Sequence, residues 1–263
     1  MKESRDMVLR ELETEQIRRT NLTKEELQKA YFDLAKENFP DDKRIKFAAD
    51  LGGCKEIGYH YELICEDWKE NRNLYFENSF GEHGRQGIEF LFEKMDTVAD
   101  EKQRVLTAFL LGKILSQFKH RDFYSNFCDR FVPMLVSLIN TNDYILRRKI
   151  IIIFGWIGGT EEIGILTRQM LSDEDSLCCA WSAASLMQMS FNRVDVKTVR
   201  EKTKTIFAQV IREERDLQAC GIMIEAVQTL FDKRWIPSSA VEDVESEKIE
   251  KARKSAVRFL SKC

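Results

Sequence analysis

The sequence predicts an all-α protein built from repeated pairs of antiparallel helices. Glycine and proline, which both disfavour helices, number only 12 and 3 among the 263 residues. Apolar residues recur at helical spacing, and one such pattern, which begins at Asp143, is repeated at three other places in the chain. Hydrophobic residues make up 43% of the chain and charged residues 32%, which is enough apolar material for a core and argues against disorder.

Composition also restricts the classes of function. The formal net charge is -3, so no global basic field points to nucleic acid. The N-terminus is charged and the longest apolar run is far below the ~20 residues that span a bilayer, so neither a secretory signal nor a membrane span is expected. The 7 cysteines are scattered without a zinc-type pair, which favours reduced, mostly buried thiols in a cytoplasmic protein.

Residues 1–86 are expected to form an N-terminal helical segment, which either caps the repeats or contains divergent ones. A polar amphipathic helix is predicted over 4–19. A second helix begins at Thr23, which forms a capping-box pattern with Glu26, and Pro40 is expected to end it. The weak apolar stripe of the first helix consists of Met7, Val8, Leu12 and Ile17.

Two further helices, over 41–50 and 56–69, are expected before a long irregular segment. The segment 70–87 is rich in asparagine and glycine, and loops of this length usually have a function. Three aromatic side chains in it are candidates for a secondary partner contact; the alternative is that they tuck back onto the helices. They are Tyr75, Phe76 and Phe80.

From residue 87 to 263 the helical pattern is dense. Pro133 is expected to kink or divide one helix, and Ser238 or Ser239 to cap a last, charged helix that closes the array. The predicted helices cover 88–95, 101–118, 123–140, 143–158, 161–171, 176–191, 196–213, 217–231 and 241–261.

The repeated pattern has an aspartate at its start, which we take as offset zero. Apolar or small residues follow at offsets +3, +7, +8, +10, +11 and +14, except for Gln103 at one of the +3 positions, and two of the four units have a glycine at +12. The aspartate is expected to cap a helix N-terminus, and the apolar offsets to face the core. Glycine at +12 favours close packing or helix termination. The four units begin at Asp100, Asp143, Asp175 and Asp216.

This pattern resembles the second helix of HEAT repeats, which is of the type Asp-x-x-Val-Arg-x-x-Ala-Ala-x-Ala-Leu-Gly. The units that begin at Asp100 and Asp143 match best, and the resemblance covers roughly residues 88–235. It implies an armadillo-like α-solenoid, in which helix pairs form a right-handed superhelix.

The resemblance further implies that the second helices line a concave face, with offsets +5, +6, +9 and +13 pointing towards it. Several of these positions are apolar here, with basic neighbours, which is typical of binding hot spots. The alternative is that tight curvature buries them against neighbouring helices. The candidate partner-binding residues are Phe109, Lys113, Arg148, Lys149, Ile152, Trp156, Trp181 and Glu225.

No catalytic signature, cofactor motif or metal-ligand spacing is present. His60, Cys65 and His83 flank the irregular segment, but their spacing matches no known set of metal ligands. Cys178 and Cys179 lie on a predicted helix without a histidine nearby, which favours structural thiols.

The leading hypothesis is therefore a non-enzymatic protein that binds a partner protein, such as a bacterial adaptor or an immunity protein that neutralises a toxin. The alternative is a HEAT-like DNA-binding protein or alkylpurine DNA glycosylase, a class that uses Trp, Asp and Arg side chains of the kind that Trp156, Trp181, Arg148 and Asp232 provide. The acidity of the chain opposes that alternative. A basic stretch is predicted to be a solvated helix face; it contains Lys197, Arg200, Lys202 and Lys204.

Overall fold

The computed structural model describes the backbone of residues 2–262, and side chains from residue 10 onward. Every regular element within this range is a helix, which confirms the all-α class. Contacts divide the chain into two compact units, Met1–Ala99 and Asp100–Cys263. The division falls later than the predicted boundary after residue 86, because α5 (Gly84–Thr97) packs against η1 (Phe76–His83).

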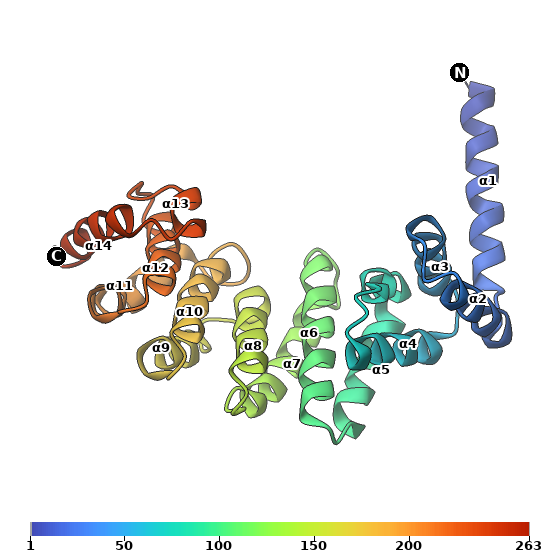
Figure 1. The fold of residues 1–263 in the computed structure, drawn as a ribbon, viewed down its shortest axis with the longest axis horizontal. Helices are drawn as coiled ribbons and strands as arrows, with labels where there is room; N and C mark the ends of the chain where they lie inside the picture. Colours follow the sequence, from blue (N-terminus) through green and yellow to red (C-terminus); the bar gives the residue numbers. More distant parts are fainter. Residues whose placement is uncertain (1, 263) are drawn as a thin grey trace. The chain divides into compact units, whose positions relative to one another are not determined.

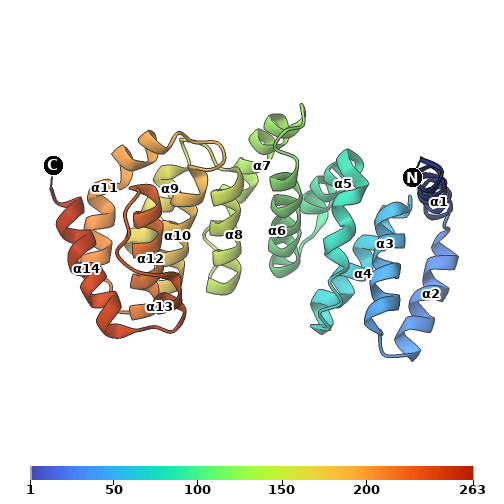
Figure 2. The same ribbon diagram turned by 90° about the horizontal axis from the view of Figure 1, so that it is seen from above.

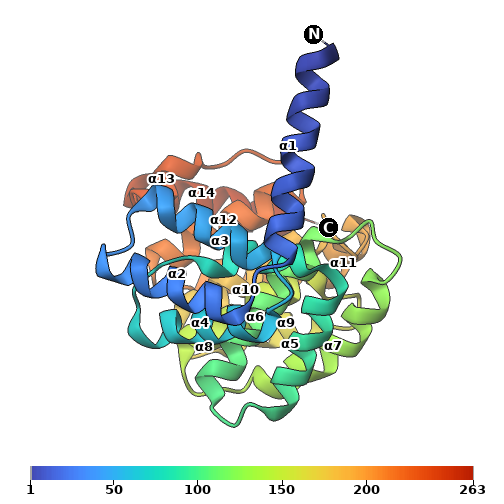
Figure 3. The same ribbon diagram turned by 90° about the vertical axis from the view of Figure 1, so that its right-hand side faces the viewer.

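The first unit begins with α1, which packs on α3 and extends beyond it (Figure 3). Arg18 and Arg19 hold its last turns by ion pairs with Asp50. Leu12 and Ile17 are exposed, and the side chains of Met7 and Val8 lie outside the described residues. The predicted capping box of Thr23 and Glu26 is present at the start of α2. The remaining helices of this unit are α1 (Lys2–Thr20), α2 (Lys24–Lys36), α3 (Asp41–Gly53) and α4 (Ile57–Glu70).

The segment 70–87 is more ordered than predicted. The 3-10 helix η1 occupies its centre and packs against α3 and α4. Both carboxylate oxygens of Asp67 accept the Leu74 backbone N–H, at 3.0 and 3.1 Å, and Arg44 donates to the Leu74 carbonyl at 2.8 Å. Side chains from α3 and α4 thus replace the backbone hydrogen bonds that a regular element would provide.

In the second unit α6, α8, α10 and α12 pack one against the next (Figures 1 and 2). The alternate helices pack beside them: α9 contacts α10 and α11, and α14 contacts α11 and α12. The bounds are α6 (Glu101–Gln117), α7 (Tyr124–Leu138), α8 (Tyr144–Ile157), α9 (Ile163–Ser172), α10 (Ser176–Met189), α11 (Val196–Glu213), α12 (Leu217–Leu230), α13 (Ser238–Glu242) and α14 (Ser246–Leu260).

The predicted register of the four repeated units is confirmed. Each of the four aspartates caps its helix and accepts a backbone N–H two or three residues ahead, as Asp143 does from Ile145 and Leu146 at 2.8 and 3.1 Å. The residues at offsets +7, +8, +10, +11 and +14 are buried in all four helices. The aspartate cap sets where each helix begins and the apolar period sets which face is buried, so the two together place the four helices in the same register.

Glycine at offset +12 allows close packing between successive helices of the row formed by α6, α8, α10 and α12. A Cβ on Gly112 of α6 would lie 2.7 Å from the Ile153 side chain of α8. A Cβ on Gly155 of α8 would lie 2.9 Å from the Ser185 Cα of α10. In both cases offset +12 of one helix meets offset +10 of the next.

The last predicted helix is divided. Residues 241–261 were expected to form one helix, but α13 ends at Glu242, and Val244 takes a left-handed φ of 50° before α14 begins. The predicted caps Ser238 and Ser239 are wrong, because Pro237 precedes α13 and no side chain caps it. Pro133 lies within α7 and does not divide that helix.

Candidate partner-binding face

Four apolar side chains predicted to line a face fall on three adjacent helices of the second unit. Phe109 of α6 and Ile152 and Trp156 of α8 are half-buried, whereas Trp181 of α10 is 38% exposed. They occupy offsets +9, +9, +13 and +6, which are three and four residues apart and so belong to one side of a helix. We call these four residues the apolar row. Their side chains are partly accessible to solvent, because none of the four is fully buried in the core and none is fully exposed.

The centre of the apolar row is a contact between α6 and α8. The rings of Phe109 and Trp156 lie 5.3 Å apart, tilted by 46°. The Lys149 ammonium lies 4.6 Å from the centre of the Phe109 ring, where a cation is attracted by the π-electron face. Burial lowers the pKa of Lys149 from its ordinary value. This cluster joins a large aromatic surface with a partly desolvated cation.

Arg148 is engaged within the chain. Its Nε lies 3.3 Å from the Asp175 carboxylate, which links α8 to the start of α10, and its guanidinium lies 5.0 Å from the centre of the Tyr144 ring. Because of these two contacts, the Arg148 side chain is less available to a partner than an unpaired cation at the edge of the face would be. Lys113 of α6 and Glu225 of α12 are half-buried at their predicted offsets.

The expectation that offset +5 faces the binding surface is wrong for three of the four helices. Val105, Ala180 and Gly221 are buried. The reason at Gly221 is that α13 covers the position, since a Cβ there would lie 2.9 Å from the Val241 side chain. The accessible stripe therefore follows offsets +6, +9 and +13.

Two of the three loop aromatics tuck back onto the helices, as the alternative predicted, and are corrected as partner contacts. Phe76 and Phe80 are fully buried, because η1 packs them against α3 and α4, with Phe76 5.5 Å from the Phe47 ring and Phe80 5.0 Å from the His60 ring. Tyr75 is 51% exposed and has a left-handed φ of 60°. Of the three, Tyr75 is the residue that a partner can reach.

The two histidines beside this loop, His60 and His83, are hydrogen-bonded to each other. His60 Nε2 lies 3.0 Å from the Phe76 carbonyl and must donate to it, so His60 Nδ1 accepts from His83 Nε2 at 2.9 Å. Burial lowers the pKa of His60 to about 3 and that of His83 to about 4. Among the side chains that the structure describes, those of residues 10–262, no group of three His, Cys, Asp or Glu is placed to hold a metal ion.

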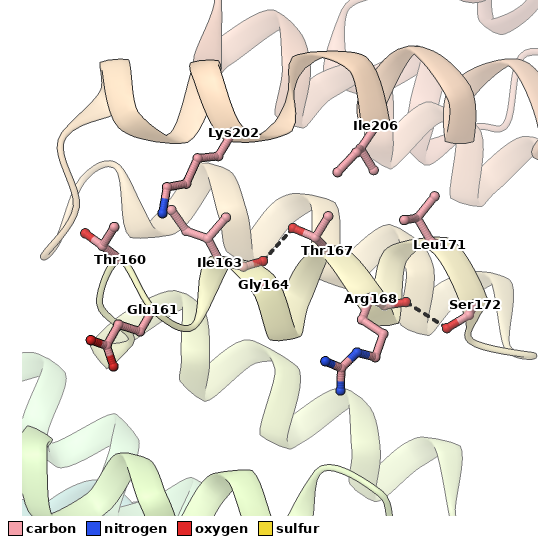
Figure 4. A pocket seen from close by; sticks show the side chains of 10 residues that line it. All are labelled: Thr160, Glu161, Ile163, Gly164, Thr167, Arg168, Leu171, Ser172, Lys202 and Ile206. Carbon is pink, nitrogen blue, oxygen red and sulfur yellow. Dashed lines mark hydrogen bonds between the residues drawn. The ribbon is translucent and has the colours of Figure 1, made fainter.

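A groove that the sequence did not indicate lies between α9 and α11 (Figure 4). It has a volume of about 700 Å³. Ile206 of α11 and Leu171 of α9 face one another across it, and the Lys202 side chain extends towards the start of α9. The sequence did not single out this groove, because the apolar residues that line it also fit an ordinary core-facing stripe of a helix. Lys202 is the one residue of the predicted basic stretch that lines it.

The basic stretch of α11 does not form a single cationic patch. Arg200 donates to the Leu230 carbonyl, Lys204 donates to the Lys262 carbonyl at 2.9 Å, and Lys197 pairs with Glu201 on its own helix at 3.9 Å. The prediction of a solvated helix face is confirmed for the exposed Lys197 and Lys202 and is wrong for Arg200 and Lys204, which are half-buried and donate to backbone carbonyls of other elements.

Comparisons with protein-family models, with curated proteins and with solved structures find no match to this chain. None of the helices within the described range has the length and apolar character needed to cross a membrane.

The cysteines from Cys54 to Cys220 are free thiols, all of them buried except the half-buried Cys65, and Cys263 lies outside the described residues. Burial raises the pKa of Cys178 to about 12 and of Cys179 to about 11, which makes both thiols poor nucleophiles at neutral pH.

Proposed function

We propose that the Asp100–Cys263 unit is a HEAT-like right-handed superhelix whose apolar row binds a partner protein. The observation that supports this most is the half-exposed Trp156, stacked beside Phe109, with the exposed Trp181 on the next helix of the row. Tryptophan is among the residues that contribute most to protein interfaces. The part of each indole that stays in water contributes no burial to the stability of the chain, which leaves that part free to be covered by a partner.

The repeated register supports the HEAT-like assignment. Four aspartate caps and buried residues at equal offsets make the four helices α6, α8, α10 and α12 equivalent, and the glycine contact between +12 and +10 repeats from α6 to α8 and from α8 to α10. Equivalent neighbours are the defining property of a repeat array. Within the class of binding proteins we propose a cytoplasmic adaptor or a toxin-neutralising immunity protein.

A capture experiment from native lysate tests this proposal. Wild type is compared with Trp156→Ala and with Phe32→Ala, a control that removes a 60% exposed aromatic side chain from α2. We expect a partner that wild type and Phe32→Ala retain and Trp156→Ala loses. Equal capture by all three proteins would contradict the proposal. The identity of the captured protein distinguishes a toxin from other partners.

A DNA-binding protein or alkylpurine DNA glycosylase is the second candidate from the sequence, and none of the side-chain contacts described for residues 10–262 favours it. Retention on heparin at low salt that declines steeply as salt is added would support it. Elution of the full chain without retention would exclude an electrostatic DNA interface.

A further inference from the structure

The predicted face carries charges of opposite sign at its two ends. At offsets +5, +6, +9 and +13, helices α6 and α8 contribute Lys113, Arg148 and Lys149 and no carboxylate. At the same offsets α12 contributes Glu225 and no cation. A segment lying along the apolar row therefore meets a basic end and an acidic end.

Among the side chains that the structure describes, Lys149 is a cation at the basic end with no carboxylate in an ion pair with it. Its ammonium lies against the Phe109 ring, which in turn contacts Trp156. The neighbouring Arg148 pairs with Asp175, but no described carboxylate forms an ion pair with Lys149. Partial burial without a counter-ion is an unfavourable state for an ammonium group, and a carboxylate supplied from outside would relieve it.

We propose that the segment docking on the apolar row is an acidic peptide segment of the partner protein. One of its carboxylates pairs with Lys149, and an adjacent apolar side chain packs on Trp156 and Ile152. This inference rests on the proposed function and specifies the chemistry of the partner. Charge-assisted hydrogen bonds at a partly desolvated site are among the stronger polar contacts.

A nucleic acid fits this face less well. A phosphate backbone lying along the apolar row would approach Glu225, whereas a peptide can place its acidic residue at one end alone. The chain as a whole has a net charge of -3, which opposes a polyanion over longer distances.

The test uses a displayed library of random linear peptides, selected on the full chain. Peptides that lose binding to Trp156→Ala are the ones that use the apolar row. We expect these to be enriched in Asp and Glu over the library. We also expect them to bind Lys149→Met roughly 10-fold more weakly than wild type, the loss for one charge-assisted hydrogen bond. Lys197→Met is the matched control, because it removes an 80% exposed lysine from α11 and should leave binding unchanged.

Amide versions of the same peptides complete a double-mutant cycle, in which the lysine of the protein and the carboxylates of the peptide are removed separately and together. With Asp and Glu replaced by Asn and Gln, a peptide should bind wild type and Lys149→Met equally. Cooperative urea unfolding shows whether each variant is folded.

Two results would overturn the inference while leaving the proposed function intact. Peptides that depend on Trp156 but are not enriched in acidic residues would do so, as would acidic peptides that bind wild type and Lys149→Met equally. A single-stranded DNA oligonucleotide that displaces the peptides would assign the face to nucleic acid instead. If no selected peptide depends on Trp156, both the inference and the proposed function fail.

Discussion

Arg147 and Asp173 form a doubly hydrogen-bonded ion pair between α8 and the loop that leads into α10. Arg147 Nε lies 2.7 Å from Asp173 Oδ2, and Arg147 Nη2 lies 2.8 Å from Oδ1. Arg147 also donates to the Thr141 carbonyl at 2.6 Å, and Asp173 Oδ1 accepts the Asp175 backbone N–H at 3.0 Å. The pair thus connects the starts of two successive helices of the row. Arg147 lies four residues after Asp143, at the position of the arginine in the HEAT-repeat pattern.

Removing one member of this pair should be strongly destabilising. The side chain of Asp173 is 2% exposed and that of Arg147 15%, so Asp173→Ala leaves a buried guanidinium without its counter-ion. We expect a loss of about 3 kcal/mol in the free energy of unfolding, measured in urea. The control is Asp129→Ala, whose carboxylate is 68% exposed in its pair with Arg193, and it should cost under about 1 kcal/mol. Equal losses in the two variants would show that burial does not set the strength of these pairs.

Two glycine substitutions should change stability in opposite directions. Gly155→Ala places a methyl group 2.9 Å from the Ser185 Cα, so α8 and α10 must separate, at a cost of about 1–3 kcal/mol. Gly164→Ala on α9 meets nothing within 4 Å and gains up to about 1 kcal/mol from helix propensity. Thermal unfolding of both variants measures the difference. A stabilised Gly155→Ala would mean that the two helices are not held at this distance.

The His60–His83 pair should make stability depend on pH. An unfolded histidine titrates near 6.5, whereas the folded pKa values are about 3 and 4. Between these values the unfolded chain binds protons that the folded chain excludes. The contribution of the pair is therefore complete above pH 6.5 and is lost as the pH falls towards 4 and 3.

The measurement is the urea midpoint at a series of pH values. His83→Gln retains a donor for His60 but cannot titrate, so its stability should fall less steeply below pH 6.5, by up to about 1.4 kcal/mol per pH unit. His120→Gln replaces an exposed histidine and should follow wild type. Parallel curves for wild type and His83→Gln would contradict the prediction.

Lys149→Met should stabilise the free protein. The methionine side chain retains apolar contact with Phe109, and the substitution removes a partly buried charge whose pKa is lowered by desolvation. We expect a gain of up to about 1 kcal/mol in the free energy of unfolding. Lys197→Met, at an exposed position, should stay within about 0.5 kcal/mol of wild type. A destabilised Lys149→Met would indicate that the interaction of the cation with the ring outweighs its desolvation.

The sequence by itself determined the helical class and the register of the four repeated helices. Aspartate caps and the apolar period act within a single helix, so Asp143 and its three equivalents could be placed without knowledge of their neighbours. The capping box at Thr23 was predictable for the same reason.

Only the tertiary structure decided which side chains remain accessible. Whether Val105, Phe80 or Trp156 is covered depends on elements distant in the sequence, as does the pairing of Arg148 with Asp175. The break at Val244, where the backbone is left-handed, lies within 241–261, which the local pattern predicts to be one continuous helix. Burial and ion pairing are properties of packed surfaces, and a periodic pattern specifies which side of a helix is apolar but not what lies against it.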